Sequence, residues 1–372
     1  MKRRDKERRK KRAGGEQVPH ALIEEILERL GVESLIRFTC VSKQWNSTIK
    51  STSFASRHLI RAQLRDPDVL LAGARAFNEP GPYTYLKKLE FGSSELKKFH
   101  IMPQPYRCCA ITGSCDGLVC VYDFERLMYI INPATRWRRS LPRPKIQQIR
   151  RVRRNLDCGY YNTQFPGFGK DTMTGKYKIV WLYNSLKLDL DGHTTCEVFD
   201  FSTSTWRYVF SSTHPTAHAS PVYLDGSLYW LTLQINGETK MIYFDLHTEV
   251  FKVMAEIPVV HASPCRTVMC ILSNRLCVSE KKNNSQDIWS LNSHMVWEKT
   301  YSLNLSITSQ WLNKSNFPIA PVTVFNKTEL LLLCQFNPCL LVKDNRIGSY
   351  SLYSKASQLD QAFPYIPSLI SI

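Results

Sequence analysis

Residues 18–59 read VPHALIEEILERLGVESLIRFTCVSKQWNSTIKSTSFASRHL. In the first part of this stretch, apolar residues recur at the three- and four-residue spacing of one helix face. These residues are Leu22, Ile23, Ile26, Leu27 and Leu30. Because Pro19 suits the first turn of a helix and Gly31 suits its end, the pattern predicts a first helix between them. Two further short helices are predicted over residues 34–40 and 42–49.

Three short helices in about forty residues lie near the lower size limit for independent folding. The stretch also has more apolar residues than such a small core needs. It therefore predicts a module that docks on a partner, with a helical cap on a larger core as the alternative.

The order of residues in this stretch resembles the F-box. The resemblance is carried by Val18-Pro19, Leu22-Ile23-x-x-Ile26-Leu27-x-x-Leu30, Ser34-Leu35 and Cys40-Val41-Ser42-Lys43-x-Trp45. The family often has Leu-Pro at the start and Pro after the first helix, where this chain has Val18 and Gly31. The resemblance implies an F-box over residues 18–60 that binds the Skp-type adaptor of SCF ubiquitin ligases and, through it, a cullin scaffold. The adaptor-binding residues that it implies are Pro19, Leu22, Ile23, Ile26, Leu27, Leu35, Val41 and Trp45.

The formal net charge of +17 comes almost entirely from two segments. Residues 1–12 carry nine basic and two acidic side chains, and residues 136–154 carry nine basic and no acidic ones. Basic residues spread over the whole chain would favour nucleic-acid binding, whereas two local clusters predict a disordered tail over residues 1–17 and a basic loop. The tail is interpreted as a solubilising arm or a nuclear-import signal, so the expected compartment is the nucleus, the cytoplasm or both.

Beyond about residue 65, short apolar strands separated by turn residues replace the helical pattern. A turn followed by an apolar strand recurs as CDGLVCVYD (115–123), LDGSLYWLT (224–232), SNRLCVSEK (273–281) and NKTELLLLC (326–334). Two strands joined by a polar turn recur as YIINPATRWRR (129–139), VFDFSTSTWRYV (198–209), YFDLHTEVFKVM (243–254) and IWSLNSHMVWEK (288–299). Residues 347–358 form a weaker fifth copy of the second element.

The large aromatic residues of the second element are 69, 45 and 46 residues apart, at Trp137, Trp206, Phe251 and Trp297. A period near 45 with several strands per copy is typical of a β-propeller. Asp116-Gly117 and Asp225-Gly226 suit tight hairpin turns, and the aromatic rings are expected to pack between neighbouring blades. The predicted fold is thus a small all-α region followed by an all-β, kelch-like propeller of about six blades. A β-sandwich or an irregular α+β domain is the alternative.

Several of these segments resemble the F-box associated domain of a large plant F-box family, a kelch-like module that recognises substrates. The resemblance is carried by SCDGLVCVYD…INPATRWRRSLP, GFGKDTMTGKYKIVWL and CEVFDFSTSTWR, and covers most of residues 105–300. The predicted domains are the tail 1–17, the F-box 18–60, a connecting region 61–104 with the length of a further blade, the propeller 105–358 and a C-terminal tail 359–372.

No catalytic residue, metal site or cofactor is predicted. Most of the twelve cysteines lie in apolar, strand-like contexts and are expected to be free buried thiols, and neither CxxC nor HExxH spacing occurs. The glycine-rich stretch 166–176 lacks the GxxxxGK[ST] order of a phosphate loop and predicts a hairpin instead. The sequence has no apolar run near eighteen residues, so a transmembrane helix is not expected.

Together with these patterns, the two resemblances imply a non-catalytic substrate receptor of an SCF-type ubiquitin ligase. The alternative is a nucleic-acid-associated or scaffold module that uses the basic clusters without ubiquitination. A substrate contact is predicted at Arg150, Arg151, Arg153 and Arg154, which would favour an acidic or phosphorylated protein. The same arginines also fit a solvated insertion. Neither a membrane nor nucleic acid is the expected partner.

Overall fold

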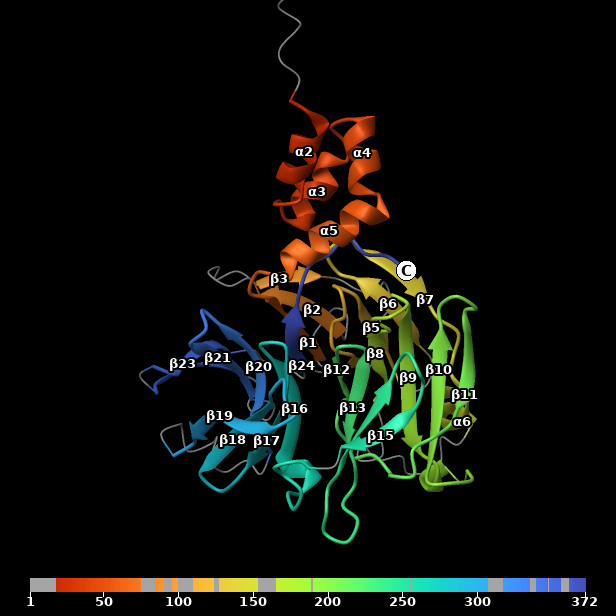
Figure 1. The fold of residues 1–372 in the computed structure, drawn as a ribbon, viewed down its shortest axis with the longest axis vertical. Helices are drawn as coiled ribbons and strands as arrows, with labels where there is room; N and C mark the ends of the chain where they lie inside the picture. Colours follow the sequence, from red (N-terminus) through yellow and green to blue (C-terminus); the bar gives the residue numbers. More distant parts are fainter. Residues whose placement is uncertain are drawn as a thin grey trace, which may run out of the picture.

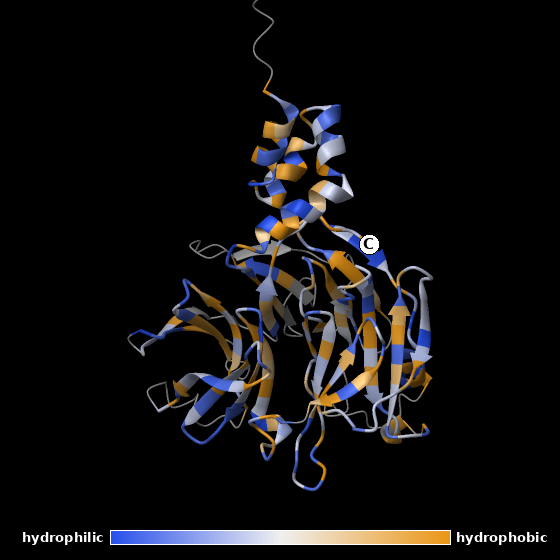
Figure 2. Ribbon diagram, in the orientation of Figure 1, coloured by the Kyte–Doolittle hydropathy of each residue, from blue (hydrophilic) through white to orange (hydrophobic). Residues whose placement is uncertain are grey.

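A computed structural model describes residues 18–74, 84–89, 96–99, 110–123, 127–152, 165–188, 190–254, 256–306, 317–334, 339–346, 348–355 and 361–372. Within these residues, a helical region stands on one face of a ring of six four-stranded sheets (Figure 1). This arrangement confirms the predicted all-α region and six-bladed propeller. Figure 2 shows apolar residues alternating with polar ones along the strands and around the helices.

The helical region consists of α2 (His20–Leu27), α3 (Val32–Phe38), α4 (Lys43–Ile49) and α5 (Thr52–Ala62). The first three correspond to the predicted helices, and α5 was not predicted. Ser42 caps α4 by accepting a hydrogen bond from the Trp45 amide at 3.1 Å, and Ser51 caps α5 through the Phe54 amide at 3.2 Å. Both helices therefore begin with the same Ser-x-x-aromatic spacing, which is the sequence signal that could have revealed α5.

The strands of the propeller pair antiparallel in every blade. In order along each sheet, they are β24 (Gln361–Tyr365), β1 (Asp68–Ala74), β2 (Thr84–Leu89) and β3 (Leu96–Phe99); β4 (Ala110–Ile111), β5 (Val119–Tyr122), β6 (Met128–Asn132) and β7 (Trp137–Ser140); β8 (Gly167–Lys170), β9 (Tyr177–Asn184), β10 (Thr194–Asp200) and β11 (Thr205–Val209); β12 (Val222–Leu224), β13 (Ser227–Leu231), β14 (Met241–Asp245) and β15 (Phe251–Met254); β16 (Thr267–Leu272), β17 (Arg275–Lys281), β18 (Ser285–Leu291) and β19 (Trp297–Asn304); β20 (Ala320–Phe325), β21 (Glu329–Cys334), β22 (Cys339–Asp344) and β23 (Tyr350–Lys355). The inner strands β8, β12, β16, β20 and β24 each contact the next in this series, so they line the centre of the ring.

Tight turns with positive φ angles join the first two strands of several blades. The predicted Asp116-Gly117 and Asp225-Gly226 turns have φ values of 52° and 78°, and of 43° and 81°. Ser273-Asn274 adopts the same conformation in a third blade, with φ values of 49° and 57°. Left-handed backbone at both central positions matches the twist of a hairpin, which confirms these turns as recurring units.

Tryptophans of two outer strands connect neighbouring blades, as predicted. The Trp206 indole N–H donates to the Pro142 carbonyl at 2.7 Å, and the Trp297 indole N–H donates to the Glu256 carbonyl at 2.9 Å. Each carbonyl lies just beyond the outer strand of the preceding blade, β7 and β15 respectively. Phe251 instead packs within its own sheet, with its ring centroid 4.8 Å from that of Phe244.

The expected C-terminal tail over residues 359–372 is corrected by the structure. Gln361–Tyr365 forms β24, which pairs with β1 and completes the blade begun by the connecting region. The ring is closed in this way by two strands from opposite ends of the propeller sequence. The closure escaped sequence reasoning because a single short strand has no period of its own, and its partner lies almost three hundred residues away.

Two smaller expectations concern thiols and the glycine-rich stretch. The nine described cysteines carry free thiols, and burial raises the pKa of the Cys120 and Cys196 thiols, which keeps them protonated. Residues 167–184 form the β8–β9 hairpin, whose turn is held by Asp171 accepting hydrogen bonds from the Met173 and Thr174 amides at 2.9 and 3.2 Å. The predicted free thiols and hairpin are thus confirmed.

The described helices include none long and apolar enough to cross a membrane.

Candidate functional site

The helical region has a small core of its own. Leu27, Leu35, Ile49 and Phe54 are at most 3% exposed and pack together. Ile23 and Trp45 pack against this cluster while remaining partly exposed. Two of the predicted adaptor-binding residues, Leu27 and Leu35, are therefore corrected to core positions, because their side chains are covered by the other helices.

A second set of large apolar side chains in the same region faces outward. Between 38% and 58% of each residue is exposed, and the set consists of Val18, Leu22, Ile26, Ile36 and Val41. Leu22 and Ile26 are four residues apart on α2, so they share one face of this helix. Contiguous exposed apolar surface marks interaction sites, and Leu22 and Ile26 supply such surface on α2. We call these five residues the apolar face.

The polar side of α2 is tied to α5. Arg57 on α5 lies 2.8 Å from Glu24 of α2 and 2.5 Å from Glu28, the residue that caps the end of α2. The pairing is solvent-exposed, so it orients the helices more than it stabilises them. It leaves α2 with a charged side against α5 and a separate side that carries Leu22 and Ile26.

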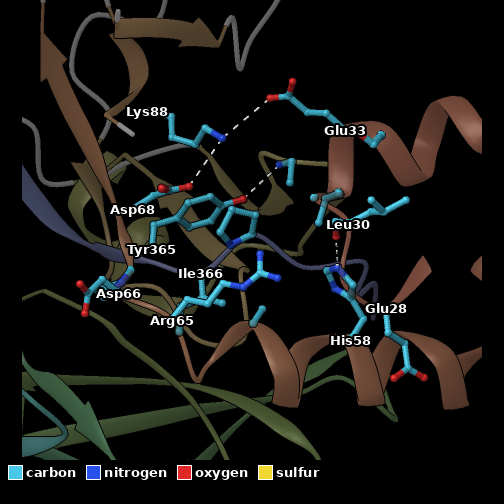
Figure 3. A pocket seen from close by; sticks show the side chains of 17 residues that line it. Glu28, Leu30, Glu33, His58, Arg65, Asp66, Asp68, Lys88, Tyr365 and Ile366 are labelled. Atoms are coloured by element: carbon cyan, nitrogen blue, oxygen red, sulfur yellow. Dashed lines mark hydrogen bonds and ion pairs between the residues drawn. The ribbon is translucent and has the colours of Figure 1, made fainter. Parts of the chain in front are cut away.

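A cavity of about 400 Å³ lies where the helical region meets the propeller (Figure 3). Its walls come from the α2–α3 turn, from α5 and the link to β1, from β2, and from the residues that follow β24. The Lys88 ammonium group of β2 lies 3.8 Å from Glu33 of α3 and 3.6 Å from Asp68 of β1, so one cation contacts both parts of the molecule. Tyr365 accepts a hydrogen bond from the Ala134 amide at 3.1 Å on the propeller side.

His58 lies in the wall of this cavity on α5 and is 4% exposed. Its Nε2–H donates to the Leu30 carbonyl at 2.9 Å, and its Nδ1 has no hydrogen-bond partner among the described residues. Burial lowers the pKa of His58 below its usual value of 6.5, and the positive charge of Arg65 lowers it further, while the Leu30 carbonyl and Glu28 act in the opposite direction. The folded helical region therefore favours the neutral imidazole.

A pH dependence of stability follows from His58. The pKa of His58 is about 6.5 in the unfolded chain and lower in the folded chain. The contribution of His58 to stability is therefore fully present above pH 6.5 and is lost as the pH falls toward the folded-state pKa. We expect the helical region to melt at a lower temperature at about pH 5.5 than at about pH 7.5. In His58→Gln, the difference between the two pH values should shrink. An equal difference in the variant and the wild type would assign the effect to other groups.

The basic segment is partly a packed helix, α6 (Lys145–Val152), at the side of the propeller away from the helical region (Figure 1). Glu197 of β10 accepts hydrogen bonds from the Lys145 and Ile146 amides at 2.7 and 3.0 Å, which caps the helix. The Gln147 side chain donates to the Asp123 carbonyl of the preceding blade at 2.7 Å. The helix therefore bridges two blades, whereas a loop was predicted.

This packing changes the expected substrate contacts. Arg150 is buried, 9% exposed, which corrects its prediction as a contact. Arg151 is exposed, and Arg153 and Arg154 lie outside the described residues. Sequence reasoning missed the helix because its cap comes from Glu197, about fifty residues later. Burial raises the pKa of Glu197, and the two α6 amides oppose that rise.

Comparisons with known proteins cover nearly the whole chain. Residues 16–57 match the family model of the F-box domain, and residues 88–372 match that of the F-box associated beta propeller domain. An F-box/LRR-repeat/kelch-repeat protein of Arabidopsis thaliana is 41% identical over 381 residues, which covers 96% of this chain and 97% of the relative. An F-box protein of the same plant is 40% identical, covering 96% and 85%. Among solved structures, TolB from Acinetobacter baumannii has a TM-score of 0.50 at 12% identity, covers 84% of this chain and 72% of its own, and bears on the fold alone.

Proposed function

This chain belongs to the family of F-box proteins with an F-box associated β-propeller domain, and we propose that it is a substrate-recognition subunit of an SCF-type ubiquitin ligase. In this role the F-box helices bind a Skp-type adaptor, which bridges to a cullin scaffold, and the propeller binds the protein to be ubiquitinated. The chain itself supplies binding and positioning, and the chemistry of ubiquitin transfer belongs to the other subunits.

The observation that carries the proposal is the apolar face. Its five side chains are exposed although the helical region already has a complete core. Fully burying one large apolar side chain contributes about 1.5–3 kcal/mol, and association costs about 4–15 kcal/mol, so several such residues are needed for a stable complex. Leu22, Ile26 and Val41 remain the predicted contacts with the adaptor, together with the exposed Pro19 and the half-buried Ile23 and Trp45.

We place the substrate on the propeller face that lies opposite the helical region. The α6 helix and the connections after the outer strands β11 and β15 lie toward that face (Figure 1). A rigid ring of blades suits the display of such connections, and holding a substrate there raises the effective concentration of its lysines near the ubiquitin-loaded enzyme. The exposed Lys145 and Arg151 of α6 favour an acidic or phosphorylated segment.

Co-purification with a Skp-type adaptor tests the proposal. The wild-type chain should retain the adaptor, and the double variant Leu22→Asp/Ile26→Asp should lose it, because two carboxylates would be buried without partners. Leu64→Asp is the matched control: Leu64 is 83% exposed but lies beyond α5, at the propeller end of the helical region, and its variant should bind like the wild type. Failure of the folded wild type to bind any Skp-type adaptor would end the proposal.

A further inference from the structure

Residues 366–372, which we call the strap, continue from β24 across the face of the propeller that carries the helices (Figure 1). The strap has no regular secondary structure, yet it is held at several points. The Asn132 side-chain amide donates to the Ser368 and Ile370 carbonyls, both at 2.9 Å, and the Ser368 hydroxyl donates to the Asp116 carbonyl at 2.6 Å. Asn132 and Ser368 are both 0% exposed, so these bonds are shielded from water.

The hydrogen-bonding capacity of Asn132 is divided between a turn and the strap. Its side-chain oxygen accepts from the Ala134 and Thr135 amides at 3.0 and 3.3 Å, which holds the β6–β7 turn. Its two amide hydrogens are left for the strap carbonyls. When the oxygen and the amide group of a buried asparagine are both hydrogen-bonded, they fix one arrangement of their partners. Losing the hydrogen bonds of either group would leave a buried polar atom unpaired, which costs free energy.

Gly117 provides the space for this arrangement. A Cβ atom at this position would lie 2.5 Å from the Ser368 hydroxyl oxygen and 2.7 Å from the Ile366 carbonyl oxygen. The φ angle of Gly117, 78°, also disfavours other residues. The Asp-Gly turn of this blade therefore serves the strap as well as the hairpin.

Side chains of the strap alternate between the two parts of the molecule. Leu369 packs against the core of the helical region, formed by Leu27, Leu35, Ile49 and Phe54. Ile370 and Ile372 pack against the propeller cluster that contains Trp181. The strap thus lies between the helices and the blades and gives each of them an apolar contact.

Polar contacts between described residues also join the two parts, beside a hollow. Lys88 and Glu33 are 3.8 Å apart, Gln63 and Asp116 are 3.5 Å apart, and the cavity of about 400 Å³ opens beside them. Weak polar contacts of this kind allow domains to move relative to each other unless an apolar interface holds them. Leu369 supplies such an apolar contact, on a segment that is itself locked to the propeller.

We propose that the strap is a positioning element, with Leu369 as its key residue, which fixes the orientation of the F-box helices on the propeller. The purpose of this orientation rests on the proposed function. The orientation would set the distance and direction between a substrate on the propeller and the enzyme held through the adaptor. The orientation itself requires no partner and can be measured on the chain alone.

The distance between the two parts tests the proposal directly. Spin labels carried by non-natural amino acids at the exposed positions Glu25 on α2 and Lys252 on β15 report this distance by pulsed electron resonance. The wild type should give one narrow distribution, and Leu369→Asp should broaden it about twofold, as expected for domains released from an apolar contact. Ser371→Asp, at an exposed strap position, is the matched control and should keep the narrow distribution. An unchanged distribution in Leu369→Asp overturns the proposal.

Hydrogen exchange of the α2–α5 amides shows whether the helices remain folded in the variant. If Leu369→Asp unfolds them, the milder Leu369→Ala decides: a broadened distribution with protected helices supports the proposal, and a narrow one overturns it. In a complex reconstituted with adaptor and cullin, ubiquitin is expected on lysines of the chain's own propeller. The number of different lysines modified should be larger in the variant than in the wild type. Loss of adaptor binding in the wild type would refute the proposed function, whereas the label distances would still report on the strap.

Discussion

A chain that lacks residues 361–372 is expected to lose the cooperative folding of the propeller. β24 occupies the inner position of its blade, where it pairs with Asp68–Ala72 of β1. Without it, the backbone groups of β1 that face the centre of the ring lose their partners, and β1 becomes an open edge. The ring would then consist of five complete blades and one incomplete one, with a gap at the point of closure. Circular dichroism during heating should show a broad transition at low temperature, accompanied by aggregation.

Substitution of Tyr365, the last residue of β24, tests the contribution of this strand to propeller stability without a deletion. It is 0% exposed, and its hydroxyl accepts a hydrogen bond from the Ala134 amide. Tyr365→Ala should lower the free energy of unfolding by about 3–5 kcal/mol, as for other large aromatic residues in cores. Tyr365→Phe keeps the ring and should cost only about 0.5–1.5 kcal/mol. A truncated chain that melts like the wild type would show that five blades and an incomplete sixth suffice.

Replacing Leu35 by alanine is expected to unfold the helical region while leaving the propeller intact. Leu35 is 0% exposed in a core of four fully packed residues. Removing a buried leucine side chain costs about 2–5 kcal/mol, which is a large share of the stability of so small a unit. Hydrogen exchange should show loss of protection for the α2–α5 amides, with protection of the blades unchanged.

The neighbouring residue Ile36 provides the control for this prediction. It is 38% exposed on the apolar face, so Ile36→Ala should change the stability of the free chain by no more than about 0.5 kcal/mol. Both substitutions are expected to weaken adaptor binding, Leu35→Ala through unfolding and Ile36→Ala through a lost contact. Equal stability losses for the two variants would contradict the division between core and apolar face.

The sequence predicted local features of the fold well. Asp116-Gly117 and Trp206 have the roles that their positions indicate, because hairpin turns and outer-strand aromatics are recognised from neighbours within a few residues. The repeated units and the length of the connecting region predicted about six blades, and the structure has six four-stranded sheets. The role of Asn132 was not predicted, because its amide binds carbonyls that lie more than two hundred residues away.

The candidate site shows the same division. Helical spacing identified the apolar residues of α2 and α3 but could not separate Leu27 and Leu35 from Leu22 and Ile26, because both pairs belong to apolar stripes of similar hydrophobicity. α5 completes the core, and its position decides which side chains remain outside. The sequence likewise could not separate buried from exposed arginines. The burial of Arg150 depends on how α6 packs between two blades.

By itself, the sequence determined the kinds of elements, their order and their repetition, because hydrophobic period and turn chemistry act between residues close along the chain. Only the tertiary structure decided which apolar residues stay exposed, which strand closes the ring, and how residues 366–372 contact both the helices and the blades. These features depend on surfaces that meet only after folding. Stretch 18–59 therefore predicts a docking module, and the folded molecule shows which of its apolar side chains are buried and which are exposed.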